Sequence, residues 1–365
     1  MNNTVILLLL KDRAEFTERW LHVHNKLNFK IPIHIADGSI TDTNKKIFLN
    51  FQNKEHTLNI SYKHYGKDTN LDAFYRKMTK AIENVDSQYV IFTCNDDFLI
   101  EKSIIEGADF LNENSEYVAA AGPIYDTAVS QTHPSHNNVW GTLSHPTNQY
   151  PAFNRLENNP ETRIYQFLSG RKNSYIWTAL HRRNVIIETS KVIQEISPPD
   201  LRFQCHLMSL LTLGKGKVSG ALPCMTLHQS NPGESAGQDL MQRGNWYQWI
   251  QSKEWFECFN KMTQAVVDQI SPNNKLGRKE LKRLIEIYYQ AYVGQMNIRE
   301  FHPTYKEELF CNGEPILKEL NAYSIFVMIN KICGTYSIPK QSNPYNFLPF
   351  FKKIFKTLIY ILKKK

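Results

Sequence analysis

The chain has 365 residues, of which 42% are hydrophobic and 12% aromatic, and its formal net charge is +8 at pH 7. This length and apolar content suffice for a full catalytic core with a smaller appendage, and the chain has no internal repeat or low-complexity tract. Its six cysteines form no CxxC pair, and the opening apolar run is too short for a signal peptide. We therefore expect a reducing, cytoplasmic compartment and exclude a disulfide-stabilised secreted protein.

The first hundred residues alternate between strand-type and helix-type segments. Residues 4–10 form a run typical of a buried strand, and an amphipathic helix is expected over about 14–25. A second apolar strand spans 31–36, a further helix should begin after the good N-cap Asn70, and the next strand spans 89–94. This alternation predicts an α/β fold with a mostly parallel sheet flanked by helices and joined by right-handed crossovers.

Acidic residues follow three of these strands: Asp12, Asp37, and the adjacent pair Asp96 and Asp97. Ligands of parallel α/β sheets bind outside the carboxyl ends of the strands, so all four residues should lie on the ligand-binding edge. Adjacent carboxylates repel each other, and Asp96 and Asp97 are therefore expected to share their site with a positive group, most often a divalent cation. The alternative is a solvated strand-to-helix turn that caps a helix.

The ordered set TVILLLLKDR, IPIHIADGS, a lysine-bearing helix around Lys77 and YVIFTCNDDF resembles the GT-A fold of bacterial family-2-type glycosyltransferases. The resemblance covers the first third of the chain well and the next third loosely. It implies a Rossmann-like nucleotide-sugar site in which Asp97 binds a divalent cation, Mg²⁺ or Mn²⁺, on the sugar diphosphate. The donor nucleotide-binding residues that it implies are Leu10, Lys11, Arg13, Asp37, Lys77, Asn95 and Asp96.

Asn95 departs from this family, whose usual sequence here is DDDF or DADF. An Asn side chain can accept hydrogen bonds but brings no charge, so the resemblance leaves Asp97 as the direct metal ligand with Asp96 in support. A cytidine monophosphate sugar carries one phosphate instead of two and would need a metal less. The lost charge is compatible with such a donor.

Asp200, after the Pro198-Pro199 turn, is the best positional match to the family's catalytic base. The Glu expected beside it is missing, and the alternative role for Asp200 is a helix N-cap. His228 ends an apolar segment, and the resemblance makes it a candidate ligand of the metal or diphosphate, although a lone histidine is more often an ordinary polar residue. His206, within an apolar helix-like run, should pack in the core.

Residues 123–173 are expected to form a long polar loop, and long loops in compact domains are usually functional or mobile. Exposed aromatic residues there can stack on sugar rings, and Arg171 and Tyr175 are the candidate acceptor-binding residues. The competing interpretation is a plain surface insertion. The histidine spacing of this stretch fits no zinc signature.

The chain divides into a catalytic domain over 1–237, a helical region over 238–340 and a basic amphipathic tail over 341–365. Within the tail, residues 347–365 carry six lysines and no acid, with apolar residues on one broad face. This stretch is too short and too charged to span a bilayer, but its pattern is typical of an interfacial helix on anionic lipid. The alternatives are a helix docked on the core and, for a basic chain, nucleic-acid binding, which the interleaved apolar residues disfavour.

The resemblance implies a glycosyltransferase, and the basic tail would place it on the inner face of the cell membrane. It would transfer a sugar from a UDP-, dTDP-, GDP- or CMP-linked donor to a surface polysaccharide, lipooligosaccharide or lipid-linked glycan, with inversion as the default. One alternative is a nucleotidyltransferase, but residues 11–14 supply no glycine for a phosphate loop. The other is a catalytically silent glycan- or lipid-binding module, which Asn95 and the missing Glu keep open.

Overall fold

The computed structural model describes residues 3–131, 138–145, 148–150, 152, 154–169, 176–230, 252–301 and 329. The candidate acceptor residues Arg171 and Tyr175 lie outside the described residues, as does the whole of the basic tail over 341–365.

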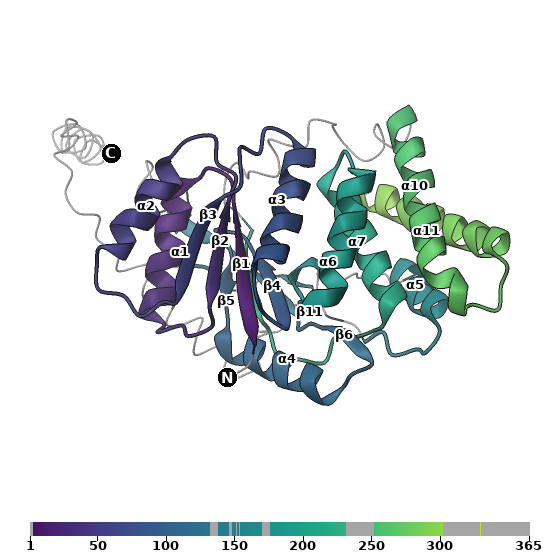
Figure 1. The fold of residues 1–365 in the computed structure, drawn as a ribbon, viewed down its shortest axis with the longest axis horizontal. Helices are drawn as coiled ribbons and strands as arrows, with labels where there is room; N and C mark the ends of the chain where they lie inside the picture. Colours follow the sequence, from purple (N-terminus) through teal and green to yellow (C-terminus); the bar gives the residue numbers. More distant parts are fainter. Residues whose placement is uncertain are drawn as a thin grey trace, which may run out of the picture. The chain divides into compact units, whose positions relative to one another are not determined.

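Seven strands form the main sheet, in the order β12-β6-β11-β4-β1-β2-β3 (Figure 1). Their bounds are β1 (Thr4–Leu10), β2 (Ile33–Asp37), β3 (Ile60–His64), β4 (Tyr89–Thr93), β6 (Tyr117–Ala120), β11 (Leu180–Arg182) and β12 (Lys217–Ser219). Only β11 runs antiparallel to its neighbours β4 and β6, whereas the other pairings are parallel. The predicted α/β architecture with a mostly parallel sheet is confirmed.

Helices cover both faces of this sheet. Their bounds are α1 (Ala14–Lys26), α2 (Thr43–Gln52), α3 (Leu71–Asn84), α4 (Glu101–Glu113), α5 (Pro160–Ser169), α6 (Arg183–Ile196), α7 (Leu201–Lys215), α10 (Lys253–Ile270) and α11 (Arg278–Phe301), with short 3-10 turns η2 (Ile176–Thr178) and η3 (Ser271–Asn273). Alternate residues of β1 face opposite cores: Leu7 packs with α3, α6 and α7, and Leu8 packs with α1 and α4. A strand buried on both faces reads as a continuous apolar run, which explains the sequence TVILLLL.

A second, four-stranded sheet stands beside the first, in the order β10-β7-β13-β5. Its strands are β5 (Phe98–Leu99), β7 (Ile124–Thr127), β10 (Asn148–Tyr150) and β13 (Thr226–Gln229), and a separate pair is formed by β8 (Val129–Gln131) and β9 (Gly141–Leu143). The expectation of one long loop over 123–173 is therefore wrong, because short strands and α5 occupy much of it. The four strands within 123–173, which are β7, β8, β9 and β10, have only three or four residues each, too few for a clear alternating pattern.

The helices α10 and α11 pack on α7 and α5 and share the larger hydrophobic core with the sheet. The expected packing of His206 is confirmed: its Nδ1 lies 2.9 Å from the Tyr289 hydroxyl and its Nε2 lies 3.2 Å from the Tyr292 hydroxyl. Burial lowers the pKa of His206 to about 4, so the ring is neutral and both hydroxyls can pair with it. Among the helices that the structure describes, none combines the length and apolarity needed to cross a bilayer.

Candidate active site

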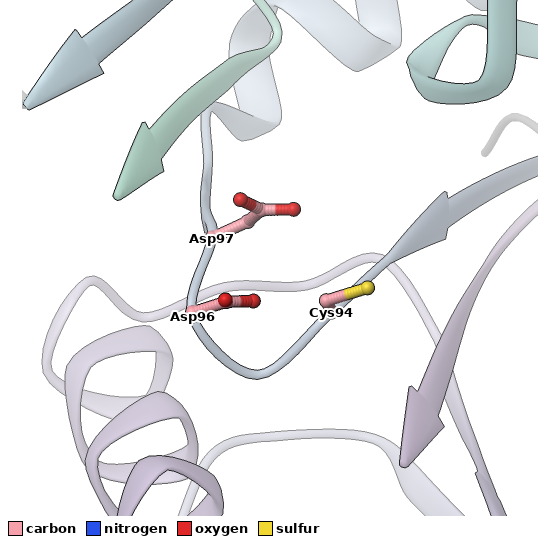
Figure 2. Close-up of side chains that lie close together, drawn as sticks. All are labelled: Cys94, Asp96 and Asp97. Carbon is pink, nitrogen blue, oxygen red and sulfur yellow. The ribbon is translucent and has the colours of Figure 1, made fainter. Parts of the chain in front are cut away.

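The parallel register brings the ends of three strands together. Leu10 of β1 lies opposite Asp37 of β2, and Leu8 of β1 lies opposite Thr93 of β4. The chain leaves β4 through residues 94–97, which we call the acidic loop, and enters β5 of the second sheet. The pair Asp96 and Asp97 therefore lies where the two sheets meet. Figure 2 shows the side chains of Asp96 and Asp97 on this loop, with the Cys94 thiol at its start. All three acidic-loop residues from Asn95 to Asp97 are buried.

Asp96 is paired with the cation of the β1–α1 turn. Arg13 Nη1 lies 3.1 Å from Asp96 Oδ2, and the two side chains are 14% and 8% exposed. The guanidinium also lies over the Phe16 ring, with 4.0 Å to the ring centroid, which is a cation–π contact. The structure therefore brings together two of the predicted donor-site residues, Arg13 and Asp96.

Asp97 is paired with the other predicted metal ligand. His228 Nδ1 lies 2.7 Å from Asp97 Oδ1. Burial would lower the pKa of His228, but the carboxylates of Asp97, Asp96 and Asp126 outweigh it and raise that pKa to about 9. Burial raises the pKa of the Asp97 carboxyl, and the His228 charge partly opposes that shift. At neutral pH we therefore assign a charged imidazolium beside a carboxylate, because each charge compensates for the burial of the other.

Arg19 of α1 is fully buried and holds the backbone of the acidic loop in place. Its Nη2 donates to the backbone carbonyls of Asn95 and Asp96 over 3.5 and 3.3 Å. Its Nη1 donates to the Val139 carbonyl over 2.8 Å and to Gln229 Oε1 over 2.7 Å. One side chain thus ties α1, the acidic loop and β13 together.

Asn95 points inward. Its Nδ2 donates to the Arg13 carbonyl over 3.2 Å and to Thr17 Oγ1 over 3.1 Å. A carboxylate at this position would have no N–H group for either acceptor. The amide therefore serves the turn that carries Arg13, which gives a structural reason for Asn at this position.

Asp37 is fully buried and already accepts several hydrogen bonds. Its Oδ1 accepts from the backbone N–H and hydroxyl of Ser39 over 2.9 and 2.5 Å, and its Oδ2 accepts from the Tyr62 hydroxyl over 2.5 Å. Burial, together with the bond to Asp37, raises the pKa of Tyr62, which stays protonated as the donor. Ser39 Oγ in turn accepts from the Asp12 backbone N–H over 2.7 Å, so Asp37 organises the β1 and β2 ends.

Lys77 lies just behind the β1 end. It is 2% exposed, donates to the Leu10 carbonyl over 2.7 Å and forms a buried ion pair with Asp68. Burial raises the pKa of Asp68 and lowers that of Lys77, and each charge opposes the shift of the other. The Asp68 carboxylate is so close to Gly38 that a Cβ there would lie 2.2 Å from it, so only glycine fits. Lys77 and Asp68 thus hold β1 against β2. At the start of the β1–α1 turn, Lys11 Nζ lies 3.5 Å from Asp12 Oδ2.

Asp200 is the N-cap of α7, which is one of the two roles expected for it from the sequence. Its Oδ1 accepts from the Arg202 backbone N–H over 2.8 Å, and the Arg202 guanidinium donates to both carboxylate oxygens over 3.1 and 2.9 Å. The preceding turn lies beside the N-terminal half of α3, because the Tyr75 hydroxyl donates to the Pro198 carbonyl over 2.8 Å. No hydrogen bond or ion pair joins Asp200 to Asp96 or Asp97 in the described part of the chain.

The residues at the end of β4 fit a hard divalent cation. Cys94, Asp96 and Asp97 can each place one ligand atom within 4.8 Å of the others. Asp96 Oδ1 has no hydrogen-bond partner among the described residues, and carboxylate oxygens are the ligands that Mg²⁺ and Mn²⁺ prefer. Burial, with the neighbouring carboxylates, raises the pKa of Cys94 well above its usual value, so its protonated thiol is a poor ligand.

Sequence reasoning missed two residues that shape this site, Arg19 and Asp68. Arg19 lies on an amphipathic helix, where an arginine usually indicates the solvent face. Its partner Gln229 is 210 positions away, so no local pattern indicates the contact. Asp68 precedes the N-cap Asn70 and reads as part of a polar turn. The one available signal was the spacing of nine positions to Lys77.

No protein-family model and no curated protein matches the chain. Three solved structures of S. aureus TarS are among those that can be superposed on it. The first, of TarS, is 12% identical with a TM-score of 0.48 and covers 83% of this chain and 44% of that one. TarS 1-349 in complex with UDP-GlcNAc is 12% identical with a TM-score of 0.47, and the match covers 90% of this chain and 79% of that one. TarS 1-349 in complex with UDP is 13% identical with a TM-score of 0.42, and the match covers 82% of this chain and 91% of that one. The chain thus spans less than half of the first structure, and all three TM-scores lie below 0.5.

Proposed function

We propose that the protein is a GT-A-type glycosyltransferase that takes its sugar from a nucleotide-linked donor. The observation that carries this proposal is the pair Asp96 and Asp97 at the carboxyl edge of β1, β2 and β4, with Arg13 and His228 bound to them. Departure of a nucleotide develops negative charge on phosphate oxygens, and a catalyst must supply compensating positive charge there. The proposed site offers two side-chain cations and two carboxylates that fit a third.

The residues of the site have separate roles in sugar transfer. Arg13 and His228 bind the donor phosphates, and Asp96 and Asp97 would hold a Mg²⁺ or Mn²⁺ ion. When bound, such an ion supplies charge stabilisation for the leaving diphosphate. Asp37 and Ser39 shape the nucleoside end through the β1 and β2 turns, and Lys77 fixes the Leu10 backbone that forms its floor.

Asp200 remains our proposed catalytic base for an inverting transfer. A base must reach the acceptor hydroxyl directly or through one water. Arg202, whose side chain is 32% exposed, would have to move away to free the carboxylate. Transfer to a surface polysaccharide, lipooligosaccharide or lipid-linked glycan, with peripheral attachment to the inner membrane face through the tail, completes the proposal.

The Arg202 contact favours one rival, a module that binds a glycan or lipid without turning over a donor. In that case Asp200 is only the α7 cap. The two functions differ in whether a nucleotide sugar is consumed.

The test is a thermal-shift titration with UDP-, GDP-, dTDP- and CMP-linked donors, each with and without Mn²⁺. Wild type should be stabilised by one nucleotide class, and Asp97→Ala should lose that stabilisation, whereas the matched variant Asp86→Ala at an exposed site should keep it. Release of free nucleotide in the presence of the stabilising donor would then separate enzyme from module. No shift with any nucleotide would contradict the proposal.

A further inference from the structure

The Arg13 guanidinium uses only part of its hydrogen-bonding capacity. Its Nη1 is paired with Asp96 Oδ2, but its Nε and Nη2 are buried and have no hydrogen-bond partner among the described residues. A guanidinium presents five N–H donors in a planar fork, and a buried charged donor without an acceptor is costly. The unfilled side of the fork therefore suits a two-point acceptor, and phosphate is such an acceptor.

The base of the Arg13 side chain is held firmly. Its backbone is left-handed, with φ of 56°, a conformation that non-glycine residues rarely adopt. The Arg13 carbonyl accepts hydrogen bonds from the backbone N–H groups of Phe16 and Thr17 over 3.0 and 3.3 Å and from Asn95 Nδ2. The guanidinium can consequently change its partner by side-chain rotation alone, while the turn and the Phe16 ring stay in place.

Asp96 carries a single negative charge, and two positive partners on its two oxygens weaken each other's binding. A cation bound to Asp96 Oδ1 would lie close to the guanidinium on Oδ2, and like charges at this separation repel. Burial makes that repulsion stronger, since Asp96 is 6% exposed. A metal ion and Arg13 therefore compete for the same carboxylate.

We propose that Arg13 is an exchangeable counter-ion: it neutralises Asp96 while the site holds no nucleotide, and it moves to a donor phosphate when one binds, leaving Asp96 to a divalent cation. This inference rests on the proposed function. It makes metal and nucleotide binding mutually dependent, because the phosphate removes the competitor of the metal. By linkage, the metal must promote nucleotide binding by the same factor.

The test measures Mn²⁺ affinity from the electron paramagnetic resonance signal of the free ion, first with no nucleotide present. Arg13→Gln should bind Mn²⁺ about tenfold more tightly than wild type, because the competing charge is gone. Lys67→Gln removes the same charge from an exposed side chain on the same edge and should match wild type.

The second measurement adds saturating UDP, GDP, dTDP or CMP. The nucleotide that binds wild type should tighten its Mn²⁺ affinity about tenfold. This coupling should be clearly smaller in Arg13→Gln, where only direct contact between the phosphates and Mn²⁺ remains. Arg13→Lys keeps the charge but not the fork, so its Mn²⁺ affinity should resemble that of wild type while the coupling falls. Circular dichroism of each variant verifies folding. If Arg13→Gln does not fold, the loss of coupling in Arg13→Lys tests the proposal instead.

The possible results distinguish failure of the Arg13 exchange from failure of the proposed glycosyltransferase function. If wild type binds a nucleotide but Arg13→Gln shows the Mn²⁺ affinity of Lys67→Gln, the exchange is wrong and the proposed function stands. Absence of Mn²⁺ binding to every variant also overturns the exchange. Absence of nucleotide binding to wild type overturns both.

Discussion

Arg19 is the side chain on which the geometry of the acidic loop depends. It spans four acceptors on three separate segments, and a lysine, with one ammonium group, cannot reach all of them. We expect Arg19→Lys to reduce nucleotide affinity in the presence of Mn²⁺ about tenfold and to lower the free energy of unfolding by about 1–3 kcal/mol. Isothermal titration calorimetry and urea denaturation measure the two effects.

Arg163 of α5 offers a matched control for Arg19. It is also buried, and it donates to the backbone carbonyls of Leu213, Glu157 and Asn158, away from the acidic loop. Arg163→Lys should therefore cost similar stability without changing nucleotide affinity. Equal losses of affinity in both variants would show that Arg19 acts only through general stability.

His228 makes stability depend on pH. Because its pKa in the folded protein is about 9, above the ordinary 6.5, the stabilising contact is fully present below pH 6.5 and is lost as the pH rises through about 9. The side chain is 46% exposed, so solvent screening limits the contribution to about 1 kcal/mol or less. The difference in melting temperature between wild type and His228→Gln should shrink between pH 6.5 and 10.

The same substitution at the exposed His145 is the control for this pH series. His145→Gln should leave the pH dependence of the melting temperature the same as in wild type over this series. A difference between wild type and His228→Gln that stays constant up to pH 10 would contradict the assignment of an imidazolium beside Asp97.

At the scale of the element, α7 begins at a residue with two possible roles. Asp200→Asn keeps one cap acceptor but loses the ion pair with Arg202, and we expect it to lower the free energy of unfolding by about 2 kcal/mol. If Asp200 is also the base, turnover by the folded enzyme should fall at least about 100-fold while nucleotide affinity is unchanged. Arg202→Gln removes the same ion pair without removing the carboxylate and should retain most turnover.

Whether the sequence reveals an element depends on how deeply that element is buried. Strands β1 and β4 are buried along their whole length and were predicted as apolar runs. Strand β3 lies at the sheet edge and has no fully buried residue, and α2 has Asn44 as its one buried residue, so neither shows a strong apolar pattern. Both were missed for that reason.

The candidate site was predictable where topology alone decides it. Parallel strands share one carboxyl edge, which is why Asp37, Asp96 and Asp97 could be placed together before their contacts were known. The ion pairs of Asp96 with Arg13 and of Asp97 with His228 depend on side-chain directions and on contacts 83 and 131 positions apart. Periodicity carries no information about such pairings.

At the scale of the whole molecule, the region over 238–340 was predicted as a helical appendage to the catalytic domain, and the structure describes its helices α10 and α11. In the structure, Trp255, Phe259 and Tyr289 belong to the same buried cluster as Phe203 and Leu207 of α7. Removal of these helices would expose that cluster to water. The helices therefore contribute to the stability of the sheet-bearing part.

Membrane attachment through residues 347–365 of the basic tail remains a prediction from the sequence. Truncation before Phe347 should leave the thermal unfolding transition unchanged and should weaken sedimentation with anionic vesicles several-fold, because the lysine-rich amphipathic stretch is gone. Neutral vesicles provide the control. Unchanged sedimentation with anionic vesicles would contradict a membrane role for the tail.

The pairing of β5 with β13 has a consequence for the order of folding. Leu99 lies opposite Thr226 in that pair, and Arg19 reaches Gln229 at the end of β13. Contacts this distant in sequence form late, because closing a long stretch of chain costs entropy before any contact is gained. A chain still being synthesised can assemble β1, β2 and β4 long before residue 229 is available. The candidate site at this edge would therefore form after those three strands, and a partly made chain would have β1, β2 and β4 but an incomplete site.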